Sequence, residues 1–140
     1  MTTRDKQRLY RVHPDLVAAV SGLIDEMAAL GHPMMVAQGL RTTRQQQLLY
    51  AQGRTAKGPI VTNANGVTSK SNHQAKDDGY GHAVDLCFVD AEPFADHHPW
   101  TEMGLRAEVR GLKWGGRWTK FPDRPHVELP AADFPGTLNA

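Results

Sequence analysis

The chain has 140 residues, with sixteen basic and fifteen acidic side chains, a formal net charge of +1 and one cysteine, Cys87. This length suits a single domain, the near-neutral charge argues against a nucleic-acid-binding protein, and one cysteine excludes an internal disulfide. The start, MTTRDKQRLYRV, is too polar for a signal peptide, and no apolar run is long enough to span a membrane. We therefore expect one domain over residues 1–140, made in the cytoplasm, monomeric and without stable membrane association.

The first half of the chain predicts two helices separated by a strand. Over Pro14–Leu30, apolar residues recur at three- and four-residue spacing, which is typical of an amphipathic helix, and proline suits its first position. MMVAQGL, residues 34–40, predicts a strand, with a buried turn as the alternative. A second helix is expected to begin at Thr42 or Thr43, each three residues before a glutamine as in a capping box, and to end near Gly53.

The second half alternates polar loops with short elements. In chain order we predict a loop over 58–73 with a short strand around 60–62, a strand over 82–90, a loop over 91–100, a helix over 101–112, a glycine-rich loop over 113–118 and a strand over 125–130. No repeat or linker divides the chain. The sequence therefore predicts a single α+β domain.

The segment SNHQAKDDGYGHAVDL, residues 71–86, concentrates side chains that bind metals. Its candidates are His73, Asp77, Asp78, His82 and Asp85. Zinc sites take imidazole nitrogen and carboxylate oxygen, and in an extended strand His82 and Asp85 point to opposite faces. A carboxylate within an apolar strand is costly to bury unless it is paired or metal-bound. Asp85 is therefore preferred as a ligand over His82, with a buried ion pair as its alternative role.

A second group of candidates lies in FPDRPHVEL, residues 121–129. Asp123 and His126 are three residues apart, and Pro125 restricts the backbone just before the histidine. A histidine that enters a strand beside a carboxylate supplies one metal ligand and one general base to a water-activating centre. The spacing alone is weak evidence, because such pairs are common on surfaces, and the combination of both segments is the stronger indication.

Together the two segments resemble the zinc peptidases that include D-alanyl-D-alanine carboxypeptidases and bacteriophage L-alanyl-D-glutamate endopeptidases, which share a fold with the hedgehog signalling domain. The pattern of that family is Ser-x-His, Gly-x-Ala-x-Asp and a late Asp- or Glu-x-x-His, which matches Ser71, His73, Gly81, Ala83, Asp85, Asp123 and His126. GLRTTRQQQLLYAQGRT also resembles its Gly-x-Arg-Thr segment. The resemblance covers about residues 16–129, and it implies helices packed on a short, mostly antiparallel sheet.

The resemblance also implies a site with one catalytic zinc ion. His73, Asp85 and His126 would bind the ion, and water would take the fourth position. Asp123 would act as the general base. Arg41, in GLRT, would stabilise the oxyanion or bind a substrate carboxylate, with a structural ion pair as the alternative.

Several other residues are assigned around this site. Those expected to contact the substrate or to support the ligands are Ser71, Gln46, Trp114 and Trp118, although the two tryptophans of WGGRW could equally belong to the core. Residues 74–80 lengthen the family spacing by about five residues, which a surface loop can absorb. His97 and His98 are left outside the catalytic site, as a loop pair able to bind adventitious metal.

The predicted function is hydrolysis of peptidoglycan stem peptides. An aspartate at position 123 and the compact chain resemble the phage-type L-alanyl-D-glutamate endopeptidases, which act on the wall after release from the producing cell. One alternative is a D,D- or L,D-carboxypeptidase that trims the terminal D-alanine. Another is a non-catalytic, hedgehog-like zinc-binding module. Asp123 argues against the second alternative, because a purely structural zinc site needs no general base and fills all four positions.

Overall fold

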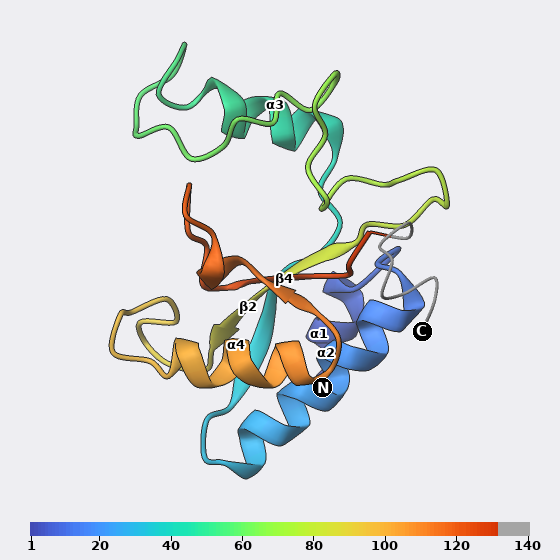
Figure 1. The fold of residues 1–140 in the computed structure, drawn as a ribbon, viewed down its shortest axis with the longest axis vertical. Helices are drawn as coiled ribbons and strands as arrows, with labels where there is room; N and C mark the ends of the chain where they lie inside the picture. Colours follow the sequence, from blue (N-terminus) through green and yellow to red (C-terminus); the bar gives the residue numbers. More distant parts are fainter. Residues whose placement is uncertain (132–140) are drawn as a thin grey trace.

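The computed structural model describes residues 1–131, and the last nine residues of the predicted domain lie outside the described part. Figure 1 shows three helices gathered on one side of a central sheet, with α3 and the loop after it standing apart from them. The elements are α1 (Thr3–Arg8), α2 (Pro14–Ala29), β1 (Met34–Gln38), α3 (Thr43–Ala51), β2 (Ala83–Phe88), α4 (Trp100–Val109), β3 (Lys113–Trp114), the 3-10 helix η1 (Gly115–Arg117) and β4 (His126–Glu128). This arrangement confirms the predicted α+β class.

The sheet is antiparallel throughout, with the strand order β1-β2-β4-β3. Its register places Asp85 of β2 opposite His126 of β4 on one side and opposite Gln38 of β1 on the other. The pairing of β1 shifts by one residue between Val36 and Gln38, which brings Gln38 rather than its neighbour opposite Asp85. Three polar residues that are distant in sequence therefore form one row across the middle of the sheet.

The core lies between the sheet and the helices α1, α2 and α4. The apolar face of α2 is buried as its periodicity predicts, through Leu16, Val20, Leu23, Ile24 and Met27. On β2, Val84, Leu86 and Phe88 belong to this core, whereas Asp85 lies on the opposite face of the strand. Burying each large aliphatic side chain contributes about 1.5–3 kcal/mol, so the sheet is held rigidly from one side and its other face is free to carry polar side chains.

The amino-terminal segment forms a helix that the sequence reading did not predict. Thr2 and Asp5 make a reciprocal capping box at the start of α1. Asp5 is buried, and its Oδ1 accepts a hydrogen bond of 2.9 Å from the backbone N–H of Val36 in β1. The polar composition of this segment concealed the helix, because its anchor to the domain is a buried carboxylate rather than an apolar face.

Three other expectations need correction. Residues 60–62 form no strand, since the loop is held by side chains such as that of Gln46, which donates to the carbonyl oxygen of Ala64. The glycine-rich segment 113–118 is not only a loop, because Lys113 and Trp114 pair with β4 and η1 follows them. The helix predicted over 101–112 runs from Trp100 to Val109, and Gly111 follows it with a φ of 86°. None of the helices in residues 1–131 has the length and apolar character to cross a bilayer.

Candidate metal and catalytic centre

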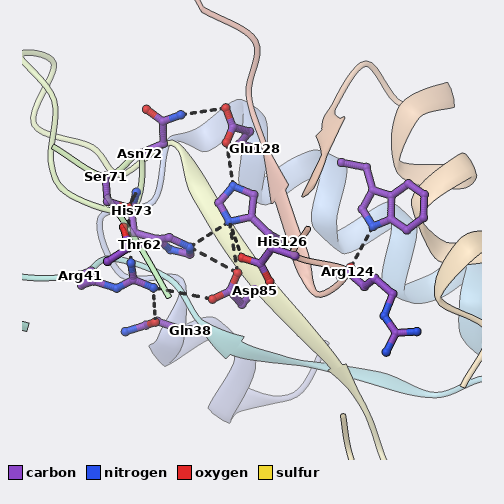
Figure 2. A network of polar contacts seen from close by, with 12 residues as sticks. Gln38, Arg41, Thr62, Ser71, Asn72, His73, Asp85, Arg124, His126 and Glu128 are labelled. Atoms are coloured by element: carbon purple, nitrogen blue, oxygen red, sulfur yellow. Dashed lines mark hydrogen bonds and ion pairs between the residues drawn. The ribbon is translucent and has the colours of Figure 1, made fainter. Parts of the chain in front are cut away.

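Three predicted ligands meet at the polar row of the sheet. His73 comes from the loop after α3, Asp85 from β2 and His126 from β4, and Figure 2 shows their side chains pointing toward one another. Nε2 of His73 lies 3.2 Å from Nδ1 of His126 and 3.3 Å from Oδ1 of Asp85. The third distance, from Nδ1 of His126 to Oδ1 of Asp85, is 3.4 Å. Three potential ligand atoms therefore surround one point.

The remaining nitrogen of each imidazole is already engaged. Nδ1 of His73 donates a hydrogen bond to the carbonyl oxygen of Gly39 at 2.9 Å, and Nε2 of His126 donates to Oε1 of Glu128 at 2.7 Å. These contacts leave Nε2 of His73 and Nδ1 of His126 facing Asp85, and each of these nitrogens offers a lone pair to a cation once it carries no proton. Oδ1 of Asp85 is buried and has no hydrogen-bond partner in the described part of the chain. Two imidazole nitrogens and a buried carboxylate oxygen that converge in this way fit a bound cation such as Zn²⁺.

The electrostatics of the cluster favour an ionised aspartate. Burial opposes ionisation of Asp85, but the contacts with His126 and His73 outweigh it and hold its pKa well below the ordinary value. Burial lowers the pKa of His126, whereas its two carboxylate partners, Asp85 and Glu128, raise it. The effect of the carboxylates is larger, and the pKa rises from 6.5 to about 9. In the absence of a metal ion the pocket therefore holds a proton on His126 at neutral pH.

Glu128 is a residue of this site that the sequence analysis missed, as it missed Gln38 and Asn72. It is buried, it shares one face of β4 with His126, and its Oε2 accepts a hydrogen bond of 2.8 Å from Nδ2 of Asn72. The sequence did carry a signal for Glu128. It lies two residues after a predicted ligand in a predicted strand, and residues i and i+2 of a strand share a face. Glu128 holds His126 in the orientation that presents Nδ1 to the cluster.

Asp123 lies beside the cluster. Its Oδ2 is 3.7 Å from Nδ1 of His126, and its pKa is raised by burial and by the negative charge of Asp85. The backbone N–H of Asp123 donates to the carbonyl oxygen of Gly115, and a Cβ on that glycine would lie 2.4 Å from the Asp123 carbonyl oxygen. Glycine at position 115 is therefore required for the close approach that places Asp123 at the site.

Arg41 is held on the other side of Asp85. Its Nη2 lies 3.8 Å from Oδ2 of Asp85 and donates to Oε1 of Gln38 at 2.8 Å, and its Nη1 donates to Oε1 of Gln46 at 2.8 Å. Desolvation by burial lowers the pKa of Arg41, while the charges of Asp85 and Asp123 raise it. Two glutamines thus fix the guanidinium plane at the edge of the cluster.

Two cavities open beside the cluster. The larger, of about 840 Å³, is lined by residues that include His73, His126, Asp123, Ser71 and Trp118. The smaller, of about 410 Å³, is lined by Ala37, Gln38, Asp85, Phe94, Asp123 and Pro125. Asp123 lines both cavities, so open space adjoins this carboxylate on two sides.

The other predicted residues divide between the site and its surroundings. The ring of Trp118 packs on His126, with centroids 4.8 Å apart, and Oγ of Ser71 accepts a hydrogen bond from the backbone N–H of His73. Trp114 does not reach either cavity: it is buried in the core, and its Nε1 donates to the carbonyl oxygen of Arg124. His82 points away from the cluster, to Oδ2 of Asp78 at 2.7 Å.

Comparison with known proteins connects this geometry to a family. Residues 65–129 match the family described as D-alanyl-D-alanine carboxypeptidase. The peptidoglycan L-alanyl-D-glutamate endopeptidase CwlK of Bacillus subtilis (strain 168) is 33% identical over 129 residues, an alignment that covers 84% of this chain and 73% of that protein.

Solved structures share the fold at lower identity. The L-Ala D-Glu endopeptidase ChiX of Serratia marcescens superposes with a TM-score of 0.69 at 24% identity, covering 96% of this chain and 92% of that one. The LD-carboxypeptidase LdcB gives a TM-score of 0.64 at 19% identity, covering 86% of this chain and 66% of that one. The vancomycin resistance D,D-pentapeptidase VanY, in complex with Zn(II), gives a TM-score of 0.61 at 18% identity, covering 84% of this chain and 72% of that one.

Proposed function

The chain belongs to the M15 peptidase family, which contains D-alanyl-D-alanine carboxypeptidases and L-alanyl-D-glutamate endopeptidases, and we propose that it cleaves the L-alanyl-D-glutamate bond of peptidoglycan stem peptides. The observation that carries this proposal is the convergence of Nε2 of His73, Oδ1 of Asp85 and Nδ1 of His126, with Asp123 beside them. The 33% identical relative, an endopeptidase for this bond by name, supports the choice of substrate.

In this proposal His73, Asp85 and His126 hold one zinc ion. A zinc ion held there would supply Lewis-acid chemistry, which activates water near neutral pH and polarises the scissile carbonyl. Asp123 accepts the proton from the attacking water and passes it to the leaving amine. The raised pKa of Asp123 suits the first step, since its carboxylate is a better base than that of an exposed aspartate, and the proton it accepts is then given to the nitrogen of the leaving amine as the C–N bond breaks.

Arg41 is proposed to stabilise the negative charge that develops on the carbonyl oxygen. Its guanidinium group is oriented by Gln38 and Gln46 before any substrate binds, and its buried Nε has no hydrogen-bond acceptor in the described part of the chain. A donor that is oriented in advance needs no reorganisation during the reaction. Ser71 and Gln46 serve as supports for His73 and Arg41, and Trp118 forms a wall for the substrate.

The two cavities favour an endopeptidase over a carboxypeptidase. An endopeptidase must accommodate peptide on both sides of the scissile bond, and cavities that meet at Asp123 provide that space. We further propose that the protein acts as a monomer on the cell wall after release from the producing cell, as an endolysin does. A D,D- or L,D-carboxypeptidase with the same cluster remains the second candidate, because LdcB and VanY share the fold.

The test is mass spectrometry of purified peptidoglycan fragments after incubation with the protein, with and without a chelator. The expected products carry a new glutamate amino terminus and are absent when the chelator is present. Loss of terminal D-alanine instead would identify a carboxypeptidase. No cleavage by the zinc-loaded protein would contradict both enzymatic assignments and leave a zinc-binding module.

A further inference from the structure

A second group of metal-binding side chains lies outside the catalytic cluster, in the loop between β2 and α4. Asp90 follows β2, and His97 and His98 precede α4. Nε2 of His98 and Nε2 of His97 lie 3.1 Å and 3.6 Å from Oδ2 of Asp90. Each residue offers a ligand atom within 4.8 Å of the other two. Two imidazoles and a carboxylate are a donor set that binds transition-metal ions.

The loop holds one of these ligands in place without any ion. The imidazole of His98 stacks on Phe88 of β2, with centroids 4.5 Å apart and an interplanar angle of 18°, and its side chain is only 9% exposed. The turn before it is tied to α4 by Nε1 of Trp100, which donates to the carbonyl oxygen of Ala95 at 2.9 Å. A metal ion therefore has to order only the more exposed side chains of Asp90 and His97, which reduces the entropic cost of binding.

We propose that Asp90, His97 and His98 form a second, peripheral site for a transition-metal cation such as Zn²⁺. Imidazole nitrogen selects zinc, nickel or copper over Mg²⁺ and Ca²⁺, which prefer sets of oxygen ligands. The site is weaker than the catalytic cluster for two reasons. Two of its ligands are solvent-exposed, and Nε2 of His98 also donates to the carbonyl oxygen of Glu92 at 2.8 Å, a hydrogen bond that a metal ion at this nitrogen must displace.

The position of this site connects it to the smaller of the two cavities beside the catalytic cluster. Phe94, in the same loop, lines the smaller cavity together with Asp85 and Asp123. Asp96 forms an ion pair with Arg124, the residue next to Asp123. An ion that joins Asp90 to His97 and His98 links the two ends of this loop and restrains the wall of the smaller cavity that Phe94 forms.

The number of zinc ions bound per chain is measured by equilibrium dialysis and elemental analysis across a range of free Zn²⁺ concentrations. The wild-type protein is compared with His97→Ala, because this 67% exposed side chain can be removed without disturbing the core. His32→Ala, a histidine outside both clusters, is the matched control. We expect wild type and His32→Ala to bind one equivalent more than His97→Ala at high free zinc. Equal stoichiometry in all three proteins would overturn the proposal, whatever the catalytic cluster binds.

A second measurement locates the ion. Hydrogen exchange of the amides of residues 89–99 is recorded at low and at high free Zn²⁺, and with excess Mg²⁺ as the probe of metal selectivity. We expect high zinc to slow exchange in this loop of the wild type several-fold, with no such effect in Asp90→Asn and none from Mg²⁺. Slowing that persists in Asp90→Asn, or that Mg²⁺ reproduces, would contradict the site.

Discussion

His126 and Glu128 lie two residues apart on one face of β4, and Nε2 of His126 donates to Oε1 of Glu128 at 2.7 Å. Asn72, next to His73, holds the other carboxylate oxygen of Glu128 at 2.8 Å. One carboxylate thus links the strand that carries one proposed ligand to the loop that carries another. This contact decides which nitrogen of His126 faces Asp85, so metal binding by the cluster depends on a residue that is not itself a proposed ligand.

Replacing Glu128 with Gln tests this dependence. Glutamine keeps an acceptor for Nε2 of His126 but removes the negative charge, so the imidazole becomes a weaker ligand. We expect the dissociation constant for zinc to rise by about 10- to 100-fold, measured by competition with a chromophoric chelator. Glu102→Gln, which removes an acid from an ion pair on the surface of α4, should leave zinc affinity unchanged. An unchanged affinity in Glu128→Gln would show that the contact is only structural.

Replacing Asp123 with Ala separates catalysis from metal binding. The side chain lies 3.7 Å from His126 and partly faces solvent, so its loss should spare the fold and the proposed ligands. We expect peptide hydrolysis to fall by about 10²- to 10⁴-fold, while zinc content and melting temperature stay at wild-type values. Hydrolysis at the wild-type rate would exclude Asp123 as the general base.

Arg41→Lys tests the proposed role of the guanidinium group. Lysine keeps a positive charge near Asp85 but cannot donate to Gln38 and Gln46 in the same fork. If Arg41 stabilises the oxyanion, kcat should fall by about 10²- to 10³-fold with zinc content retained. Arg44→Lys, on the exposed face of α3, is the control. Near-normal kcat in Arg41→Lys would instead favour a simple ion pair with Asp85.

Zinc binding should release a proton near neutral pH. Asp85 and Glu128 raise the pKa of His126 from 6.5 to about 9 in the metal-free protein, so at pH 7 zinc has to displace a proton from this imidazole. Affinity should therefore rise by about tenfold per pH unit and level off as the pH approaches that raised pKa. Calorimetry in buffers of different ionisation enthalpy measures the released proton. Binding without proton release would mean that His126 is neutral before zinc arrives.

Asp5→Ala tests the anchor of α1. Asp5 caps its own helix and accepts the backbone N–H of Val36 at 2.9 Å, and alanine would leave that buried donor unpaired. We expect the free energy of unfolding, measured in urea, to fall by about 1–3 kcal/mol. Asp15→Ala removes an exposed acid from the first turn of α2 and should change it far less. Equal effects would contradict the anchoring role.

Local patterns predicted the elements whose stability is local. The periodicity and Pro14 predicted α2, and the Thr42–Gln45 capping box, present in the structure, predicted the start of α3. Local patterns did not predict the elements that depend on contacts with residues distant in the sequence. α1 depends on a carboxylate that bonds to β1, and β3 is a two-residue strand that exists only because β4 lies beside it.

The sequence by itself determined which side chains could form the site: two histidines and two aspartates in motifs that resemble those of a zinc peptidase, one of the aspartates lying on the polar face of an apolar strand. Only the tertiary structure decided how they meet. The register of β2 on β4 places Asp85 opposite His126, and the carbonyl oxygen of Gly39 and the carboxylate of Glu128 select the nitrogens that face the cluster. The strand register and the contact with Gly39 join residues from different elements, and Glu128, although it lies on the same strand as His126, is also held by Asn72, 56 positions away. Spacing along a chain carries no information about a partner that arrives from another element.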